Sequence, residues 1–194
     1  MSTIPSLPAN PGIAAKIGVL PYAKNVAVDV VLAESVDRIR ARGITVGGLL
    51  QRTGEPHSNG RLSIWLDDIG NGETLRLDQP RGPGAKDCIV DPDSLAHAAC
   101  LLRRAVEQDS QLIVVNRFGY AESEGGGMRA EIADAVCSDA VVLIAVRKSR
   151  LDDLERFLGG ACSVLPLSSA SIADWVERAV GTRRQGIAGQ VAGV

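Results

Sequence analysis

Short apolar runs alternate along this chain with stretches in which apolar residues recur at every third or fourth position. Continuous apolar or β-branched runs are typical of strands, and longer stretches of helical spacing are typical of helices. The pattern predicts strands over residues 17–22, 44–50, 111–116, 140–146 and 163–167. It also predicts helices over 28–42, 92–109, 128–139 and 171–180, and a short helix that begins at Leu151 and is capped by Ser149.

One segment has a different pattern. Residues 61–69 and 73–77 alternate apolar and polar positions around a Gly-Asn-Gly turn, which predicts a hairpin. Strands that alternate with helices form an open, mostly parallel sheet with helices on both faces. We therefore expect a three-layer α/β fold, with a mostly parallel sheet and an antiparallel hairpin extension. In such folds ligands bind beyond the carboxyl ends of the strands. This directs attention to the loops after Tyr22, Asn116 and Val146.

A single domain is expected over residues 16–180, because a chain of 194 residues buries enough apolar surface to fold alone. Residues 1–15 contain three prolines and little apolar mass, and residues 181–194 carry four glycines without a sustained period. We expect both ends to be flexible.

Composition and charge exclude several classes of partner. The net charge of -2 gives no general attraction to phosphate backbones, and two residues each of Trp, Tyr and Phe offer few stacking platforms. Nucleic acid is therefore not an expected partner. The sequence shows no secretory signal and no apolar run of about 20 residues, so we expect a cytoplasmic protein without a membrane span. Four dispersed cysteines form no CxxC pair, and His57 and His97 are isolated, so no metal site is expected.

The loop after the first strand is where a phosphate-binding GxxxxGK[ST] sequence would stand. Residues 20–29 read LPYAKNVAVD and contain no glycine. Without residues that tolerate positive φ, a nest of backbone amides around a phosphate is hard to build. Lys24 remains a candidate for meeting an anion at the helix N-terminus. The alternative is that Lys24 is an ordinary solvated lysine.

Three motifs carry a resemblance to a known family: GITVGGLLQR at 43–52, RLSIWLDDIGNGE at 61–73 and LIVVNRFGYAE at 112–122. Their order resembles the nucleoside-triphosphatase family first described from thermophiles, in which a "vGGF" strand precedes a hairpin and an acidic strand reads "vDEiG..E". The resemblance implies a sheet of P-loop NTPase type with a degenerate phosphate loop. Asn116 and Arg117 stand where that family's Asp-Glu would hold Mg²⁺ and polarise water. An asparagine amide cannot act as a base.

Two further motifs resemble more closely the bacterial domain of unknown function 2478 family. Its "RGPGA..C..D" stretch matches RGPGAKDCIVD at 81–91, and its "N.FG..E..G.G.R.EI" stretch matches NRFGYAESEGGGMRAEI at 116–132. The match covers roughly residues 16–165. Genes of this family often lie near molybdate-transport genes, so the resemblance implies a role in molybdenum or oxyanion physiology.

Both family motifs contain candidate binding loops. In the first, amides and cations of Arg81, Gly82, Gly84 and Lys86 could converge on a phosphate or molybdate; the alternative is a Gly-Pro turn with solvated cations. Cys88, just beyond, is either a packed thiol or one activated by Lys86. The loop of the second motif, residues 118–129, is either a ligand-binding loop or a flexible acidic surface loop. The candidate residues of this motif are Asn116, Arg117, Gly119, Glu122, as the catalytic or ligand-accepting carboxylate, and Arg129, as an anion contact.

Three functional hypotheses follow. The first is a non-hydrolysing relative of P-loop nucleotide-binding proteins that binds a nucleotide or an oxyanion and acts as an accessory or regulatory factor, with Mg²⁺ required only if a nucleotide binds. The second is a phosphohydrolase or transferase that uses Glu122 as its base and Arg81, Lys86 and Arg129 as anion clamps. The third is a module that binds a protein partner and no small ligand.

Overall fold

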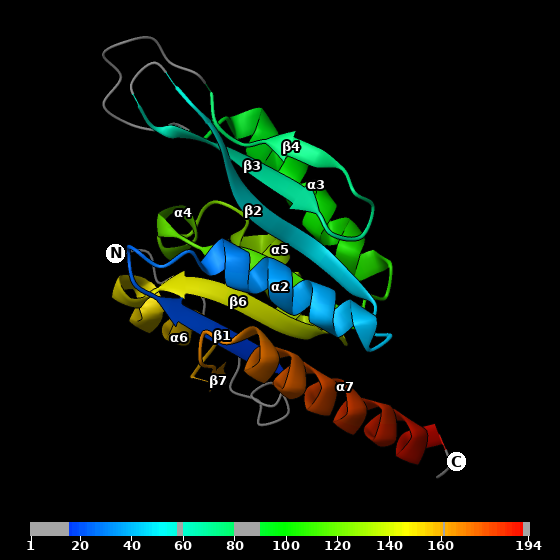
Figure 1. Ribbon diagram of the computed structural model, residues 1–194. Helices are drawn as coiled ribbons and strands as arrows, with labels where there is room; N and C mark the ends of the chain where they lie inside the picture. Colours follow the sequence, from blue (N-terminus) through cyan, green and yellow to red (C-terminus); the bar gives the residue numbers. More distant parts are fainter. Residues whose placement is uncertain (1–15, 58–59, 80–89, 161, 192–194) are drawn as a thin grey trace.

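The computed structural model describes residues 16–57, 60–79, 90–160 and 162–191, with side chains described as far as residue 182. Its centre is a seven-stranded sheet in the order β4-β3-β2-β5-β6-β1-β7 (Figure 1). From β2 to β7 in that order neighbouring strands are parallel, while β3 and β4 extend the sheet as antiparallel strands. The strands are β1 (Ile17–Tyr22), β2 (Val46–Pro56), β3 (Leu62–Asp68), β4 (Thr74–Arg76), β5 (Leu112–Phe118), β6 (Val141–Arg147) and β7 (Ser163–Val164).

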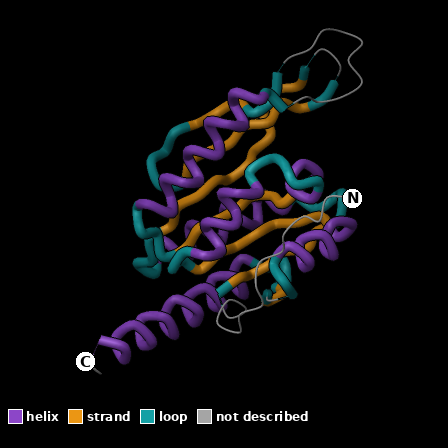
Figure 2. The backbone as a smooth tube through the Cα atoms, turned by 180° about the vertical axis from the view of Figure 1, so that it is seen from behind, coloured by secondary structure: helices purple, strands orange, loops and turns teal. Residues whose placement is uncertain are grey.

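Helices cover both faces of the sheet. On one face α2 and α7 pack side by side, and on the other lie α3, α5 and α6 (Figures 1 and 2). This confirms the expected three-layer α/β fold. The helices are α2 (Val28–Ala41), α3 (Pro92–Glu107), α4 (Tyr120–Ser123), α5 (Arg129–Cys137), α6 (Leu151–Phe157) and α7 (Ser169–Val191). Among the described helices, none is both long enough and apolar enough to cross a membrane.

Particular residues explain where α3 begins, where α2 ends and how closely β2 approaches β5. Asp91 caps α3 by accepting a hydrogen bond from the Ser94 amide at 3.0 Å, and proline follows at the first helical position. Gly43, with φ of +75°, ends α2 in the left-handed conformation that glycine adopts without strain. Gly48, with φ of +100°, brings β2 close to β5, and a Cβ there would lie 2.2 Å from the Val114 carbonyl oxygen.

The structure corrects other predicted ends. β2 continues beyond residue 50 to Pro56, because its polar second half pairs with β3 in an exposed hairpin. The sequence pattern did not predict this part of the strand, since it contains no apolar run. Ser149 does not cap α6: it lies in a 3-10 turn, Lys148–Arg150, and the N-cap position is Arg150, which makes no side-chain capping bond. α7 runs past Val180 to Val191, where no apolar period marks it.

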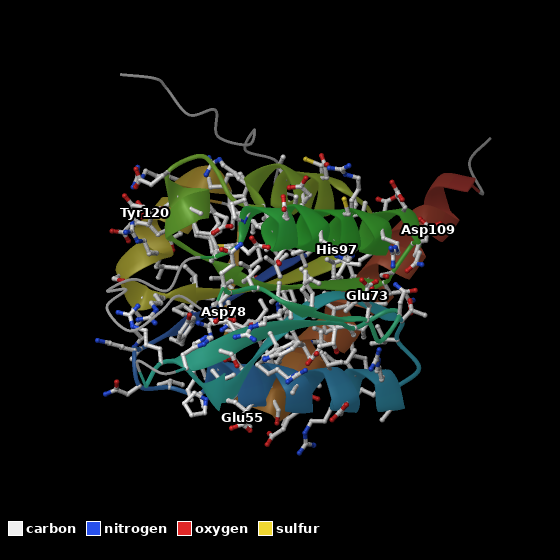
Figure 3. The ribbon with its side chains drawn as sticks, turned by 90° about the horizontal axis from the view of Figure 1, so that it is seen from above. Glu55, Glu73, Asp78, His97, Asp109 and Tyr120 are labelled. Carbon is white, nitrogen blue, oxygen red and sulfur yellow. The ribbon has the colours of Figure 1, made fainter. Side chains whose placement is uncertain are left out.

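All parallel strands end at the same edge of the sheet, which we call the carboxyl edge. Figure 3 shows its position: Tyr120, just after β5, and Asp109, just before it, lie at opposite ends of the molecule. The carboxyl edge carries the β1–α2 loop, the β5–α5 connection with its short helix α4, and the 3-10 turn after β6. The first two of these segments contain the described residues that the sequence predicts to contact a ligand.

Candidate functional site

The β1–α2 loop does not present its amides as a phosphate nest. The Val26 amide donates to the Ala23 carbonyl oxygen at 3.1 Å, and the Val28 amide donates to the Val26 carbonyl oxygen at 2.9 Å. These donors are therefore used within the loop itself. Lys24 is exposed and has no side-chain partner among the described residues.

An internal ion pair stands at the N-terminus of α2 instead. Arg117 Nη2, at the end of β5, donates to Asp29 Oδ1 at 3.0 Å and to Oδ2 at 2.8 Å. Asn116 Nδ2 adds a third contact to Asp29 Oδ1 at 3.3 Å. The Arg117 guanidinium also lies over the Tyr22 ring, 5.5 Å from its centroid. A carboxylate in the first turn is favoured by the helix dipole, so the chain supplies its own anion where a phosphate loop would hold a ligand's phosphate.

Glu122 is buried and braces the loop after β5. Its Oε2 accepts from the Gly119 amide at 2.9 Å, and its Oε1 accepts from the Met128 amide at 3.0 Å. Both carboxylate oxygens therefore accept hydrogen bonds from backbone amides. Gly127 fits tightly beside this carboxylate: it has φ of +60°, and a Cβ there would lie 2.1 Å from Glu122 Oε1.

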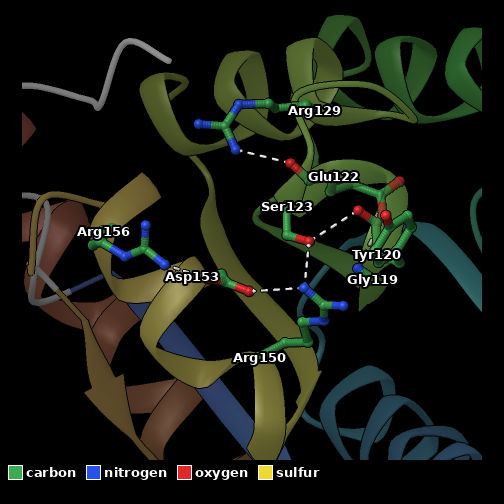
Figure 4. Close-up of polar contacts among 8 residues, drawn as sticks. All are labelled: Gly119, Tyr120, Glu122, Ser123, Arg129, Arg150, Asp153 and Arg156. Atoms are coloured by element: carbon green, nitrogen blue, oxygen red, sulfur yellow. Dashed lines mark hydrogen bonds and ion pairs between the residues drawn. The ribbon is translucent and has the colours of Figure 1, made fainter. Parts of the chain in front are cut away.

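Arginines tie this loop to the next one, as Figure 4 shows. Arg129 Nη1 donates to the Glu122 carbonyl oxygen at 2.9 Å, and its guanidinium lies 4.2 Å from the centroid of the Phe157 ring on α6. Burial lowers the pKa of Arg129. Arg150 Nη1 donates to Ser123 Oγ at 3.1 Å and to an Asp153 oxygen at 3.2 Å. Arg129 therefore helps to hold the loop through Nη1, and its role as an anion contact stays a prediction.

A cavity of about 410 Å³ lies beside this braced loop, on the side of β5 that faces the hairpin. Most of its wall is apolar, with a few polar residues contributed by β2, β5 and α4. The lining residues are Leu49, Gln51, Leu66, Leu77, Val90, Leu95, Asn116, Arg117, Gly119, Tyr120, Ala121, Glu122 and Met128. An apolar cavity with few polar groups is the usual form of a small-molecule site.

The structure therefore brings together part of the predicted set. Asn116, Arg117, Gly119 and Glu122 line one cavity, with Arg129 bonded to the same loop. Lys24 is not among the lining residues. The predicted loop of Arg81, Gly82, Gly84 and Lys86, together with Cys88, lies outside the described residues.

Sequence reasoning missed two residues of this region. Gln51 was not predicted because it stands beyond the apolar part of β2, although it alternates in step with the buried Leu49. Asp29 gave no local signal, since its partner Arg117 is 88 positions away. Within the part of the chain that is described, no group of three or more His, Cys, Asp or Glu residues is arranged to hold a metal ion.

Neither histidine is among the residues that line the cavity, and both lie in ion-pair contacts. His57 contacts the buried Asp78, and His97 lies 2.8 Å from a carboxylate oxygen of Glu73 (Figure 3). Burial acts to raise the pKa of Asp78, but hydrogen bonds from the Ile64 amide and His57, with the charge of Arg76, outweigh it and lower that pKa.

Comparison with known proteins places this geometry in context. The chain is 29% identical over 160 residues to a protein of Bradyrhizobium diazoefficiens named molybdenum import ATP-binding protein ModC 2. That match covers 82% of this chain but only 18% of the relative's length. The solution structure of a human cancer-related nucleoside triphosphatase superposes with a TM-score of 0.58, over 86% of this chain and 95% of that one, at 13% identity. This likeness confirms the P-loop NTPase type of fold.

The family comparison agrees with the two motifs that carry the resemblance in the sequence. A family model described as a protein of unknown function, DUF2478, matches residues 17–175, which is most of the chain. The matched region contains the whole sheet and the carboxyl edge with its cavity. The chain therefore belongs to the DUF2478 family, on a fold of P-loop NTPase type.

Proposed function

We propose that this chain is a non-hydrolysing relative of P-loop nucleotide-binding proteins, which binds a small anionic or nucleotide-like ligand at its carboxyl edge and acts as an accessory factor in oxyanion import. The observation that carries the proposal is the ion pair between Asp29 and Arg117 at the N-terminus of α2. It puts a protein carboxylate at the end of the helix that would otherwise attract phosphate.

Hydrolysis of a triphosphate needs groups that the described residues of this edge do not supply. A P-loop enzyme neutralises the β- and γ-phosphates with amides, a lysine and Mg²⁺, and it orients water with an acidic or amide side chain. Here the β1–α2 amides of Val26 and Val28 are bonded within the loop, and Asp29 would repel a γ-phosphate. At the end of β5, Arg117 brings a positive charge to a position where a metal ion would need ligands.

Unpaired positive charge at the same edge supports an anionic ligand. Three cations at this edge are exposed and have no side-chain partner among the described residues: Lys24 after β1, Arg147 at the end of β6, and Lys148 in the 3-10 turn that follows. β1 and β6 are adjacent, and Tyr22 pairs with Arg147 in register, so these cations leave neighbouring strand ends. Such a group attracts a compact oxyanion through charge alone.

The accessory role is supported by the relative's name. That relative is called a molybdenum import ATP-binding protein, and this chain matches about a fifth of its length. We therefore propose molybdate, or a nucleotide that reports on its transport, as the ligand. The partner that receives the signal would be a component of an oxyanion importer.

Calorimetric titration with ATP, GTP, molybdate and tungstate tests the proposal, with phosphate release measured on the same samples. We expect saturable binding of at least one of these ligands without phosphate release above the protein-free rate. For an oxyanion, the double variant Lys24→Ala/Lys148→Ala should bind more weakly, while Arg38→Ala, an exposed cation on α2, should bind like the parent. Magnesium-dependent turnover at the rate of ordinary NTPases would overturn the proposal.

A further inference from the structure

An irregularity near the end of β5 turns two successive side chains toward α2. The pairing of β5 with β6 changes register between Val115 and Phe118, and both of these residues belong to the buried cluster on the α3 face. In a regular strand, Asn116 and Arg117 would point to opposite faces of the sheet. Here both side chains donate to Asp29 on α2. The irregularity therefore gathers their polar groups on the α2 face, as bulges beside binding sites often do.

The ends of β1 and β6 bring a second arginine to the same face. Tyr22 belongs to the buried cluster beneath α2, and it pairs with Arg147 in register, so the two side chains leave the sheet on one face. The Arg117 guanidinium lies over the Tyr22 ring, 5.5 Å from its centroid. Both arginines are therefore neighbours of Tyr22 at the carboxyl edge, where α2 begins (Figure 1).

Asp29 uses only part of the hydrogen-bonding capacity of Arg117. Both carboxylate oxygens accept from the same nitrogen, Nη2. Nη1 has no partner among the described residues, and Nε is buried without one. A guanidinium binds a carboxylate or a phosphate most strongly through two parallel N–H donors. The side chains of Arg117 and Asp29 are 30% and 22% exposed, so an anion in solvent can approach the pair.

The charges at this edge determine the size of the anion that it can hold. Lys24, Arg147 and Lys148 are exposed and have no side-chain partner among the described residues. These three charges are enough to attract one compact dianion. The charge of Arg117, in contrast, is already balanced by Asp29. A second phosphoryl group beside the first would share the edge with the Asp29 carboxylate, and like charges at short range repel each other.

We propose that Asp29 sets the anion selectivity of the carboxyl edge: it occupies Arg117 and repels polyphosphates, so that a single compact oxyanion is preferred. The inference rests on the proposed function, because it concerns the anion site proposed there. Without the Asp29 charge, the Arg117 guanidinium can turn two nitrogens toward a second phosphoryl group. A purely structural ion pair would affect stability when it is broken, but it would leave the anion preference unchanged.

Calorimetric titration of the full chain with molybdate, inorganic phosphate and pyrophosphate tests this inference. We expect the parent to bind pyrophosphate no more tightly than phosphate. Asp29→Asn should bind pyrophosphate at least about 10-fold more tightly than the parent does, which is the usual contribution of one charge-assisted hydrogen bond. The ratio of pyrophosphate affinity to phosphate affinity should rise with it.

Two further variants separate the freed guanidinium from the lost negative charge. Asp37→Asn removes an exposed carboxylate farther along α2, so it changes the net charge equally and should leave the affinity ratio as in the parent. The double variant Asp29→Asn/Arg117→Gln should lose the added affinity for pyrophosphate, because glutamine has no charged fork. Circular dichroism verifies that each variant is folded, and Asp29→Ser replaces Asp29→Asn if the latter is not.

The inference is overturned if Asp29→Asn binds pyrophosphate no more tightly than the parent, or if the parent already prefers pyrophosphate to phosphate. It is also overturned if the gain persists in the double variant or if Asp37→Asn shows the same gain. Saturable molybdate binding by the parent, with an unchanged anion preference in Asp29→Asn, would refute this inference alone. Phosphate release from ATP by the parent would instead refute the proposed function.

Discussion

Replacing Glu122 with glutamine distinguishes two roles of this carboxylate, as a structural acceptor of backbone amides and as a catalytic base. The two side chains have nearly the same shape, so a base that merely faces substrate tolerates the change without loss of stability. Here, however, both oxygens accept backbone amides, from Gly119 and from Met128. Glutamine keeps one acceptor oxygen and turns an NH₂ donor toward the second amide.

One buried amide is then left without an acceptor. An unsatisfied buried donor costs about 1–3 kcal/mol, and Glu122 is 6% exposed. We therefore expect Glu122→Gln to lower the free energy of unfolding by about 2 kcal/mol, which corresponds to roughly 4–8 °C in Tm for a domain of this size.

Urea unfolding followed by circular dichroism measures this loss. The midpoint should fall while the slope m stays unchanged, because the surface exposed on unfolding is the same. Glu124→Gln, two positions along and exposed, is the matched control and should change the free energy by less than about 0.5 kcal/mol. An equally small effect for Glu122→Gln, combined with loss of a measurable phosphohydrolase activity, would refute the bracing role.

Three other outcomes follow from the structure. Gly127→Ala should destabilise the protein by about 1–3 kcal/mol, because residue 127 has a positive φ and its new Cβ would contact the buried Glu122 carboxylate. Gly126→Ala should destabilise the protein much less, because its Cβ would have no neighbour nearer than 3.6 Å. Thermal melts of the two variants compare these effects. Because the pKa of Asp78 is lowered on folding from its usual 3.8, its contribution is present above that value and is lost as pH falls below it. The stability gap between the parent and Asp78→Asn should therefore close on acidification through this range in pH-dependent urea titrations; a constant gap would contradict it. Burial, and then the charge of Glu155, raises the pKa of the Cys162 thiol, so at pH 8 iodoacetamide should alkylate Cys162 more slowly than exposed Cys100, as peptide mass spectrometry can show.

Hydrophobic periodicity predicted the central sheet because its strands are buried on both faces. β5 and β6 are nearly continuous apolar runs, and none of the helices in the described part of the chain shares that pattern. The second half of β2 and the helix α4 escaped prediction for the opposite reason: they are polar and are held by pairing or by loop bracing rather than by their own sequence.

The site was harder to predict than the fold because its main contacts are distant in sequence. Asn116 and Arg117 were identified by the resemblance, because they stand at the position of that family's Asp-Glu. Their partner Asp29 is brought to them only when β1 and β5 share one sheet. Glu122 was predicted as a site residue because it is a carboxylate in the loop of the second family motif. Only the folded loop shows that both its oxygens accept hydrogen bonds from backbone amides.

Backbone amide NMR during titration with Mg²⁺ and ATP tests the central claim most directly. If the Asp29–Arg117 pair occupies the phosphate position, the amides of residues 26–29 should keep their chemical shifts at millimolar nucleotide, whether or not the nucleotide contacts Lys24, and the Arg117 side-chain signals should be unchanged. Saturable shifts that include residues 26–29, accompanied by a change at Arg117, would mean that the loop does enclose a triphosphate and would contradict the account.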